Sequence, residues 1–482
     1  MGFNRVFVVA IWLFVVSLVV QFGARVSGNV VFQVYHKFTG ENKSLNEYME
    51  HDTFRHRRIL SGADLPIGGD NSPMSAALYF TKIRIGSPPR DYHVQVDTGS
   101  DLLWVNCAGC TTCPKKSGLG IPLSLYDPEL STSSKTIMCE QDTCSVSLDP
   151  SNHECIFGTR CMYIVRYGDG SSTTGYFVRD TVQLNRISGN LQTAEMKGSI
   201  MFGCGSEQQG GLGQSQQALD GILGFGQANT SIISQLASSK KVKKMFSHCL
   251  SGSKGGIFAI GEVDHPKVNS TPMLPNMMHF TIELKAIDIG GEFVHMQYTF
   301  NPTAKRATII DSGTTLAYLP QDVYAEIMHK VMSAQPNAHT HTPDHQFTCY
   351  NWHGNIDDAF PTITFHFANS LKLIVPPHQY MFKTSHHYWC IGFLSSGLHP
   401  RAGSDTILLG DIVLKDRLVT YNMEDQTVGW TDYDCSSSIK VKDEESGKVY
   451  EVGAHDISWA GKMRGLILLW LVLSIAIIVV MY

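Results

Sequence analysis

An internal repeat constrains the fold of this chain more than any other feature. Residues 95–100 read QVDTGS and residues 309–314 read IIDSGT, so each copy runs from an apolar stretch into Asp, a hydroxyl residue and Gly. Each copy is followed, roughly 100 residues or more along the chain, by two apolar residues and Gly, at 222–224 and 408–410. This duplication predicts two similar β-rich lobes, each presenting one Asp where a strand ends in a turn.

The composition supports a β-rich protein of more than one domain. The chain has 482 residues, a formal net charge of −5, and 43% hydrophobic and 17% charged residues. The length suits two or three domains, and the mixed charge argues against nucleic-acid binding through a basic face. Alternation at Tyr92, Val94 and Val96 predicts a strand. Helical spacing predicts one helix over 323–332, and a second helix is expected over 231–246.

The chemistry follows from the two repeated acids, Asp97 and Asp311. The hydroxyls of Ser100 and Thr314 are placed to donate hydrogen bonds to the outer carboxylate oxygens. If the lobes bring the carboxylates face to face, their repulsion prevents both from ionising at moderately acidic pH, so the pair shares one proton. One carboxylate then takes a proton from a water molecule while the other, protonated, polarises a carbonyl group. The repeat therefore predicts general acid–base hydrolysis without a covalent intermediate.

Over residues 78–436 the chain resembles the pepsin-like aspartic endopeptidases, on both Asp-(Thr/Ser)-Gly copies and both apolar-apolar-Gly segments. The shared proton is a known property of that family and is carried over with the resemblance. The resemblance implies an all-β, bilobal pepsin-like fold with two mainly antiparallel β lobes, a central substrate cleft and few short helices. It also implies that Asp97 and Asp311 are the catalytic pair. The expected substrate is an extended peptide or protein segment whose backbone pairs with the cleft edges.

A flap over the cleft is implied by residues 165–170, which read VRYGDG. By resemblance Tyr167 is the flap tyrosine, Gly168 and Asp169 lie at the hairpin tip, and Trp104 supports the tyrosine. Glycine suits a mobile hairpin tip that closes over a peptide.

The Cys residues point to disulfides, and the chain is similar to the plant branch of the family with a Cys-rich first lobe. Twelve Cys fit an exported, disulfide-bonded protein. Residues 107–113 (CAGCTTC) have two interpretations, a metal-binding knot and a disulfide-tied insertion. We favour disulfides, because exported thiols oxidise and no matching His pair is near. By resemblance Cys349 and Cys390 pair within the second lobe, and the other pairings stay open. We expect no metal and no cofactor.

The first part of the chain predicts export and a zymogen. Arg5 precedes an apolar stretch, and compact residues at the −3 and −1 positions end at Gly28, which is typical of a secretory signal peptide. A retained signal anchor is the alternative. Residues 29–75 are polar and basic and are interpreted as a removable propeptide, with a disordered arm as the alternative. Arg55–Arg58 is a weak convertase-type cleavage signal.

The last part of the chain predicts a lipid anchor. The apolar run Gly465–Tyr482 has no basic residue after it, which favours a GPI-attachment signal over a transmembrane helix. Gly453 and Ser446 are candidate attachment residues, with 436–438 further upstream. The predicted domains are a signal peptide (1–28), a propeptide (29–75), an N-terminal lobe (76–270), a C-terminal lobe (271–437), a linker (438–453) and a removed anchor signal (454–482).

Other residues carry weaker signals. Asn229 and Asn269 begin N-glycosylation sequons, whose use export permits. The His residues at 339–345 and 386–387 are interpreted as parts of solvated loops rather than ligands, and Asp411 as structural rather than a third acid.

The sequence thus predicts an acid-favoured aspartic endopeptidase, a monomer, tethered by a GPI anchor to the outer face of the plasma membrane. The alternative is a non-catalytic cell-surface binding protein on the same scaffold. Both Asp residues, both neighbouring hydroxyls and Tyr167 are retained in this sequence, which favours the enzyme.

Overall fold

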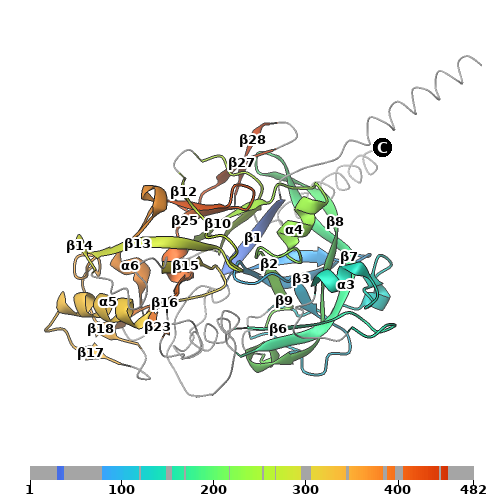
Figure 1. Ribbon diagram of the computed structural model, residues 1–482, viewed down its shortest axis with the longest axis horizontal. Coiled ribbons are helices and arrows are strands. Elements are labelled where there is room, and N and C mark those ends of the chain that lie inside the picture. Colours follow the sequence, from blue (N-terminus) through green and yellow to red (C-terminus); the bar gives the residue numbers. More distant parts are fainter. Residues whose placement is uncertain are drawn as a thin grey trace, which may run out of the picture.

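The protein folds into two β-rich lobes that lie side by side. A computed structural model describes residues 30–36 and 79–453, apart from 119–120, 148–154, 168–169, 216–217, 252–254, 266–267, 295–305, 343–346, 384–387, 397–404 and 444–446. In Figure 1 the first lobe runs from blue to green and the second from yellow to orange. Most described elements are strands and the helices are few, which confirms the expected fold class.

The elements of the first half are mainly strands. They are β1 (Val30–His36), β2 (Tyr79–Ile85), β3 (Arg90–Asp97), β4 (Trp104–Asn106), β5 (Lys135–Thr136), α3 (Asp142–Ser147), β6 (Met162–Arg166), β7 (Ser172–Gly189), β8 (Gln192–Gln209), β9 (Gly221–Gly224), α4 (Ile232–Ser238), β10 (Met245–Ser251), β11 (Gly255–Ile260) and β12 (Asn269–Pro272).

The second half adds the longest of the described helices and further strands. Its elements are β13 (Thr281–Ile289), β14 (Glu292–Phe293), β15 (Arg306–Ile310), β16 (Ala317–Leu319), α5 (Gln321–Ser333), β17 (Thr340–His341), β18 (Cys349–Asn351), β19 (Ile363–Phe367), β20 (Lys372–Val375), α6 (Pro377–Tyr380), β21 (Met381–Lys383), β22 (Tyr388–Ile391), β23 (Phe393–Ser395), β24 (Ile407–Leu409), α7 (Asp411–Leu414), β25 (Arg417–Asn422), β26 (Thr427–Asp432), β27 (Ile439–Lys442) and β28 (Val449–Val452).

One continuous sheet joins the two lobes. Its 14 strands run in the order β12-β26-β25-β10-β11-β1-β2-β3-β9-β4-β8-β7-β5, with β6 paired to β7. The strands β25 and β26 come from the end of the second half, yet β25 pairs antiparallel with β10 and lies beside it in Figure 1. A separate eight-stranded sheet, β20-β19-β13-β15-β24-β16-β23 with β14, belongs to the second lobe. The first repeated Asp therefore ends a strand of the shared sheet, and the second follows a strand of the other sheet.

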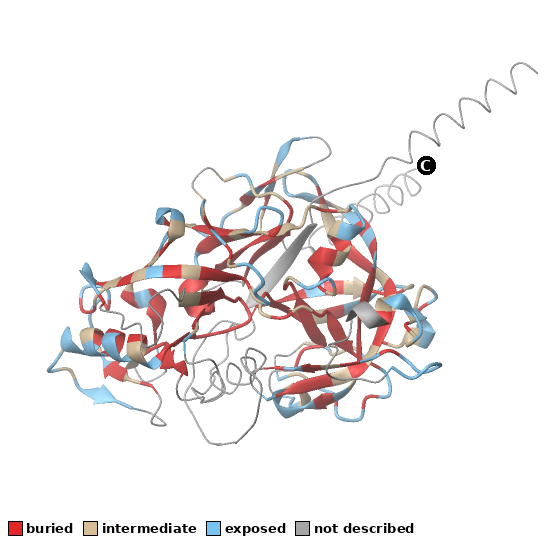
Figure 2. Ribbon diagram, viewed as in Figure 1, coloured by how far each residue is buried: buried red, intermediate tan, exposed pale blue. Residues whose placement is uncertain are grey.

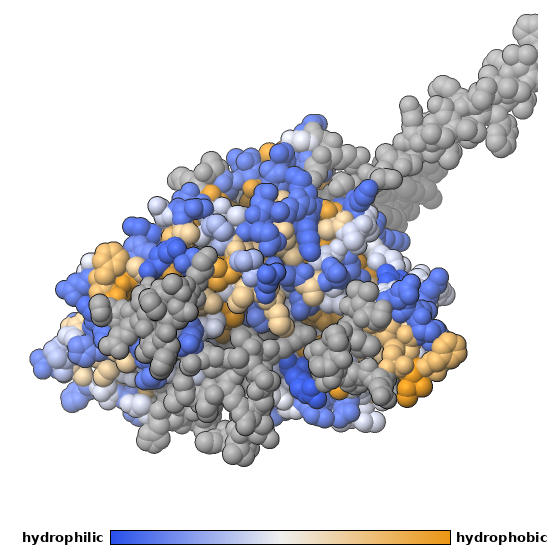
Figure 3. All heavy atoms as spheres, in the orientation of Figure 1, coloured by the Kyte–Doolittle hydropathy of each residue, from blue (hydrophilic) through white to orange (hydrophobic). Residues whose placement is uncertain are grey.

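Aromatic side chains fill the region where strands of both lobes meet. The rings of Phe225 and Phe258 lie 4.2 Å apart between centroids, and those of Phe246 and Tyr421 lie 4.6 Å apart. Figure 2 shows the buried residues in red along the strands, and the face drawn in Figure 3 is largely hydrophilic. Burial of these large apolar surfaces is the main force that holds the lobes together.

The predicted helices have different outcomes. The expected helix over 323–332 is confirmed by α5, which buries Val323, Ile327 and Val331 on one face. The second prediction, 231–246, is wrong in length, because α4 ends at Ser238 and β10 begins at Met245. Lys240 has φ 55, in the left-handed region, and a residue in that conformation ends a helix.

Within the described part of the chain, no helix has the length and apolar character needed to cross a membrane.

The strand β1 occupies an interior position in the shared sheet. It pairs antiparallel with β11, from Val30 opposite Ile260 to Val34 opposite Gly256, and its last two residues pair with the start of β2. The β11 residues that it pairs with are buried. Because buried backbone groups need hydrogen-bond partners, the position of β1 has to be filled for this sheet to stay continuous. The strand β1 lies in the predicted propeptide, and removal of that propeptide stays a prediction. If the propeptide is cleaved, residues 30–36 have to stay bound in the sheet, or another segment has to take their place.

Deleting residues 30–36 should therefore destabilise the fold. The loss would unpair the buried β11 backbone, and each unsatisfied buried group costs about 1–3 kcal/mol. We expect a fall in the thermal unfolding midpoint of about 10 °C or more, or loss of secretion. An equally long deletion within 44–52, in the same predicted propeptide, is the comparison. An unchanged midpoint for the 30–36 deletion would contradict a structural role for β1.

Candidate active site

The two repeated Asp residues lie at matching positions in their sheets. Asp97 ends β3, which runs parallel to β9 and places Asp97 opposite Gly224. Asp311 directly follows β15, which runs parallel to β24, and its backbone N–H donates to the Leu409 carbonyl at 3.1 Å. The apolar-apolar-Gly segments of the sequence are thus β9 and β24, the strands that lie beside each Asp.

Glycine is required at the end of both flanking strands. A Cβ atom at Gly224 would lie 2.4 Å from the backbone carbon of Asp101, and one at Gly410 would lie 2.3 Å from the carbonyl oxygen of Leu316. Such approaches are far below ordinary contact distances, so no other residue fits without moving the backbone. The flanking strands can therefore approach the Asp-bearing turns closely, and this explains the Gly in each repeat copy.

The two Asp-bearing turns face each other across the lobe boundary. A Cβ atom at Gly99 would lie 2.6 Å from Asp311 Oδ2. The backbone N–H of Ser312 donates to Thr98 Oγ1 at 2.9 Å, and the Thr98 hydroxyl donates to Asp311 Oδ1 at 3.5 Å. A side chain at 99 would collide with the opposite carboxylate, so Gly99 is what permits this approach.

Each carboxylate accepts a matching pair of hydrogen bonds. Asp97 Oδ1 accepts from the Gly99 N–H at 2.9 Å, and Asp97 Oδ2 accepts from the Ser100 hydroxyl. Asp311 Oδ1 accepts from the Gly313 N–H at 2.7 Å, and Asp311 Oδ2 accepts from the Thr314 hydroxyl at 2.6 Å. Both carboxylates are thus fixed in orientation by their own turns. This is the role that the sequence predicted for Ser100 and Thr314.

Burial sharpens the electrostatics of the pair. Asp97 is 1% exposed and Asp311 is 5% exposed. Two carboxylates on facing turns, with little access to solvent, repel strongly when both are ionised.

The predicted flap tyrosine, Tyr167, lies close to the tryptophan predicted to support it, Trp104. Tyr167 follows β6, and its backbone N–H donates to the Ser171 carbonyl at 2.9 Å across the turn. The Trp104 indole N–H, from β4, donates to the Tyr167 hydroxyl at 2.6 Å. Both side chains are 2% exposed and belong to one apolar cluster. Gly168 and Asp169 lie outside the described residues.

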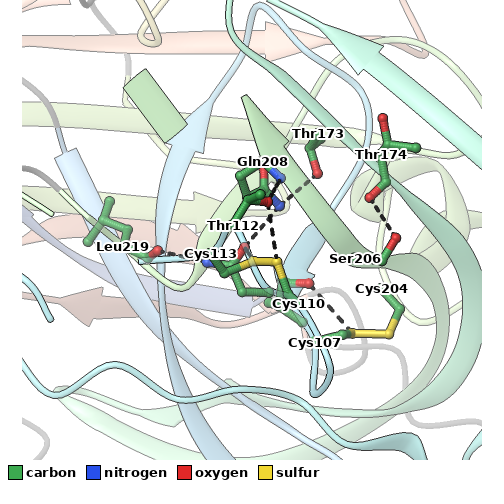
Figure 4. Close-up of a disulfide and its surroundings, with 12 residues drawn as sticks. Cys107, Cys110, Thr112, Cys113, Thr173, Thr174, Cys204, Ser206, Gln208 and Leu219 are labelled. Carbon is green, nitrogen blue, oxygen red and sulfur yellow. Dashed lines mark hydrogen bonds between the residues drawn. A yellow bond between two sulfur atoms is a disulfide. The ribbon is translucent and has the colours of Figure 1, made fainter. Parts of the chain in front are cut away.

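Two disulfides lie in and beside segment 107–113, as Figure 4 shows. Cys204 on β8 is bonded to Cys107, just after β4, and Cys110 is bonded to Cys113. Gln208 joins this segment to β7, because its Nε2 donates to Thr173 Oγ1 at 3.0 Å. The Gln208 N–H donates to Thr112 Oγ1 at 2.8 Å. The insertion is therefore tied to the base of the predicted flap.

All twelve Cys residues form disulfides. The pair that the resemblance implied, Cys349–Cys390, is confirmed. The disulfide interpretation of segment 107–113 is confirmed too. The other pairs, which the sequence left open, are Cys107–Cys204, Cys110–Cys113, Cys139–Cys155, Cys144–Cys161 and Cys249–Cys435.

Some site residues were missed in the sequence. Thr98 and Ser312, which follow the two acids, make the contact between the turns, and the hydroxyl residue at this place in both copies was the available signal. Asp411 is fully buried at the start of α7, and its backbone N–H donates to the Thr314 carbonyl at 2.7 Å.

Asn229 and Asn269 are exposed, and Gly453 directly follows β28. Ser446, His345 and His386–His387 lie outside the described residues, whereas His339 and His341 are exposed.

Comparison with known proteins identifies the family. The family models described as xylanase inhibitor N-terminal and xylanase inhibitor C-terminal match residues 79–262 and 279–432. Aspartic proteinase 36 of Arabidopsis thaliana is 49% identical over 434 residues, which cover 90% of this chain and 89% of that protein. The chain belongs to the plant pepsin-like aspartic proteinases. Aspartic proteinase 39 of the same plant is 43% identical over 475 residues, which cover 98% of each chain.

Solved structures share the fold at lower identity. Basic 7S globulin from soybean has a TM-score of 0.60 and 18% identity, over 84% of this chain and 96% of that chain. The likeness extends through both lobes but shows the fold alone, since the sequences are too different to carry a shared activity.

The Trp104–Tyr167 contact generates a prediction about this family's reaction. Trp104→Phe and Tyr167→Phe each remove the same hydrogen bond, which is worth about 1 kcal/mol. We expect each variant to lower kcat/KM for peptide cleavage by about fivefold, and the double variant to be little worse than either.

Trp352→Phe is the control, because the Trp352 indole N–H has no hydrogen-bond partner among the described residues. Unfolding midpoints of all variants separate lost stability from lost activity. Fully additive losses in the double variant would count against a functional link between the two side chains.

Proposed function

We propose that this protein is an aspartic endopeptidase that hydrolyses peptide bonds with a water molecule activated between Asp97 and Asp311. The observation that carries the proposal is the matched set of hydrogen bonds on two buried carboxylates that belong to facing turns. A structural pair of acids needs no such symmetry. The same arrangement is what a reaction with two acid–base groups requires.

The proposed mechanism uses the two carboxyl groups in turn. The ionised carboxylate takes a proton from the water molecule, whose oxygen attacks the peptide carbonyl carbon. The protonated partner donates its proton to the carbonyl oxygen, which gives a tetrahedral gem-diol. The carboxyl group that took the water proton then donates it to the amide nitrogen, and the other, now ionised, takes a proton from one gem-diol hydroxyl as the C–N bond breaks. The products are a carboxylic acid and an amine, and the pair again holds one shared proton. The hydrogen bonds from Ser100 and Thr314 hold both carboxyl groups in place through these steps.

A second candidate is a non-catalytic binding protein on the same scaffold. The observation in its favour is that the two matching family models are named after xylanase inhibitors. Membership of this family therefore does not by itself show that the chain is catalytic. Against it, this chain keeps the full set of donors around both acids and the Trp104–Tyr167 pair. We therefore favour the enzyme.

Substitution of either acid tests the proposal. Asp97→Asn and Asp311→Asn should lower cleavage of a denatured protein at acid pH by about a thousandfold or more, because neither variant can share and transfer the proton. Asp91→Asn, an exposed carboxylate on the same strand that pairs with Lys82 at 2.9 Å, should keep full activity. Wild-type activity should be blocked by pepstatin and should be highest below neutral pH.

Two outcomes would contradict the assignment. An active Asp311→Asn variant would mean that the wrong residues are named. A wild-type protein that folds, shows no cleavage at any pH and still binds a partner would favour the binding protein.

The last two described strands, β27 and β28, bear on the proposed membrane anchor. The strand β28 pairs with β27, and Val452 is only 6% exposed. The Leu191 N–H donates to the Glu451 carbonyl at 2.7 Å, so β28 is also fastened to the turn between β7 and β8. Attachment at Ser446 would remove β28, whereas attachment at Gly453 would keep it. We therefore place the proposed GPI attachment at Gly453, which tethers the enzyme to the outer face of the plasma membrane.

A phospholipase experiment tests the anchor and its position together. Phosphatidylinositol-specific phospholipase C should release the protein from membranes, and the C-terminal peptide of the released protein should end at Gly453 by mass spectrometry. Resistance to the enzyme, with residues 454–482 still attached, would contradict the anchor. A released protein ending at Ser446 would contradict only the attachment residue.

A further inference from the structure

The loop between β12 and β13 lies at the sheet edge that carries the second repeated Asp. The strand β13 runs antiparallel to β15, with Thr281 opposite Ile309. The residues before Thr281 therefore lie beyond the end of β15, where this Asp follows. The Ile310 N–H, next to the Asp in the chain, donates to the Phe280 carbonyl at 3.0 Å. We call residues 274–280 the methionine turn.

The segment after β9 lies at the matching edge of the first lobe. The strand β9 runs parallel to β3 and ends beside the first repeated Asp. The Gly226 N–H donates to the Ser100 carbonyl at 2.8 Å. The Ala228 N–H donates to Asp101 Oδ1 at 3.0 Å. Gln227, between these two residues, is thus held against the first Asp-bearing turn.

The Gln227 side chain joins the two edges. Its Nε2 donates to the His279 carbonyl at 2.8 Å and to the Met277 carbonyl at 3.3 Å. A side-chain amide nitrogen has two N–H donors, and both serve the methionine turn. The Leu274 N–H closes the base of this turn by donating to the Thr281 carbonyl at 2.7 Å. The backbone of the methionine turn is therefore fixed from two sides, close to both acids.

The methionine turn exposes two adjacent apolar side chains. Met277 is 40% exposed and Met278 is 61% exposed. Residues 268–282 contain no Asp, Glu, Lys or Arg. Exposed apolar surface is favourable to bury, so a fixed turn that holds two such side chains beside the acids indicates a contact surface for another apolar group. Methionine is unbranched and polarisable, and it adapts to partners of different shape.

We propose that Met277 and Met278 form an adaptable apolar surface that selects one apolar side chain of the peptide substrate, and that Gln227 is the positioning residue that holds this surface. The inference deepens the proposed function and rests on it. An extended peptide whose scissile carbonyl lies at the acids continues for about 3.3 Å per residue to each side. A side chain near the scissile bond therefore reaches the methionine turn. The substrate class is a peptide with a large apolar residue at that one position.

Met278→Ser and Met278→Lys test the surface with a library of short peptides that varies one position at a time. Met278→Ser should lower kcat/KM about three- to tenfold for peptides with Leu, Ile, Phe or Met at one position, because part of an apolar contact is lost. Preferences at the other positions should stay. Met278→Lys should also raise the relative cleavage of peptides with Glu at that same position, above about pH 5, where Glu is ionised.

Met332→Ser is the matched control. Met332 is 40% exposed, as is Met277, and it belongs to α5. In Figure 1 this helix lies at the end of the second lobe away from the first lobe. The control variant should cleave every peptide of the library as the wild type does. Thermal unfolding midpoints show whether each variant is folded at the pH of the assay.

Gln227→Leu tests the positioning role, because it removes both N–H donors to the methionine turn. For a peptide with a large apolar residue at the selected position, KM should rise about three- to fivefold and kcat should change by less than about twofold. A peptide with Gly at that position should keep both constants. Gln335→Leu is the control, since Gln335 Nε2 donates to the Ala359 carbonyl at 2.9 Å, and it should leave both peptides unaffected.

The outcomes separate this inference from the proposed function. A wild-type protein without cleavage at any pH overturns both. An active wild type whose library profile is unchanged in folded Met278→Ser and Met278→Lys variants overturns this inference alone. Equal losses for all peptides, the same change in Met332→Ser, or failure of both Met278 variants to fold would also overturn it, since the turn would then be structural. An unchanged KM in Gln227→Leu would overturn the positioning role.

Discussion

Repulsion between two buried carboxylates is the constraint on which this structure depends. Asp97 and Asp311 come from different lobes, and turns that face each other hold them with little exposure to solvent. Like charges in such a place move apart where the scaffold is flexible, and one of them takes up a proton where the scaffold is rigid. The scaffold is rigid here because each acid accepts hydrogen bonds from its own turn and is flanked by a glycine-ended parallel strand. Such a rigid arrangement is what the proposed acid–base chemistry needs from the two acids.

The lobes are joined by a sheet that neither half of the chain builds alone. The strand β25 comes from the end of the chain, pairs with β10 and places Tyr421 next to His248. The early strand β1 fills the place between β11 and β2 in the same sheet. Because these strands come from distant parts of the chain, the geometry of the acids depends on the whole chain being folded.

Much of the fold and of the site could be predicted from local sequence. The Asp-Thr-Gly copies, the flanking Ile222–Gly224 and Leu408–Gly410 segments and the helix around Val323 each carry their signal within a few residues. The expected end of the second helix was wrong, because Lys240 adopts a left-handed conformation that many residue types avoid and that no nearby Gly announces. The Cys249–Cys435 disulfide could not be paired from the sequence, because the fold brings together two residues that lie 186 positions apart in the chain.

The sequence by itself determined that two acids exist in equivalent turns, because turn chemistry needs Gly and hydroxyl residues at fixed offsets from Asp. Only the tertiary structure decided what surrounds them. Thr98 hydrogen bonds with Ser312, and Tyr421 with His248, although the two residues of each pair lie far apart in the chain. Such contacts follow from how sheets pack and twist, which depends on all strands at once. Local patterns therefore identify the two acids, and the packing of the lobes decides which groups surround them.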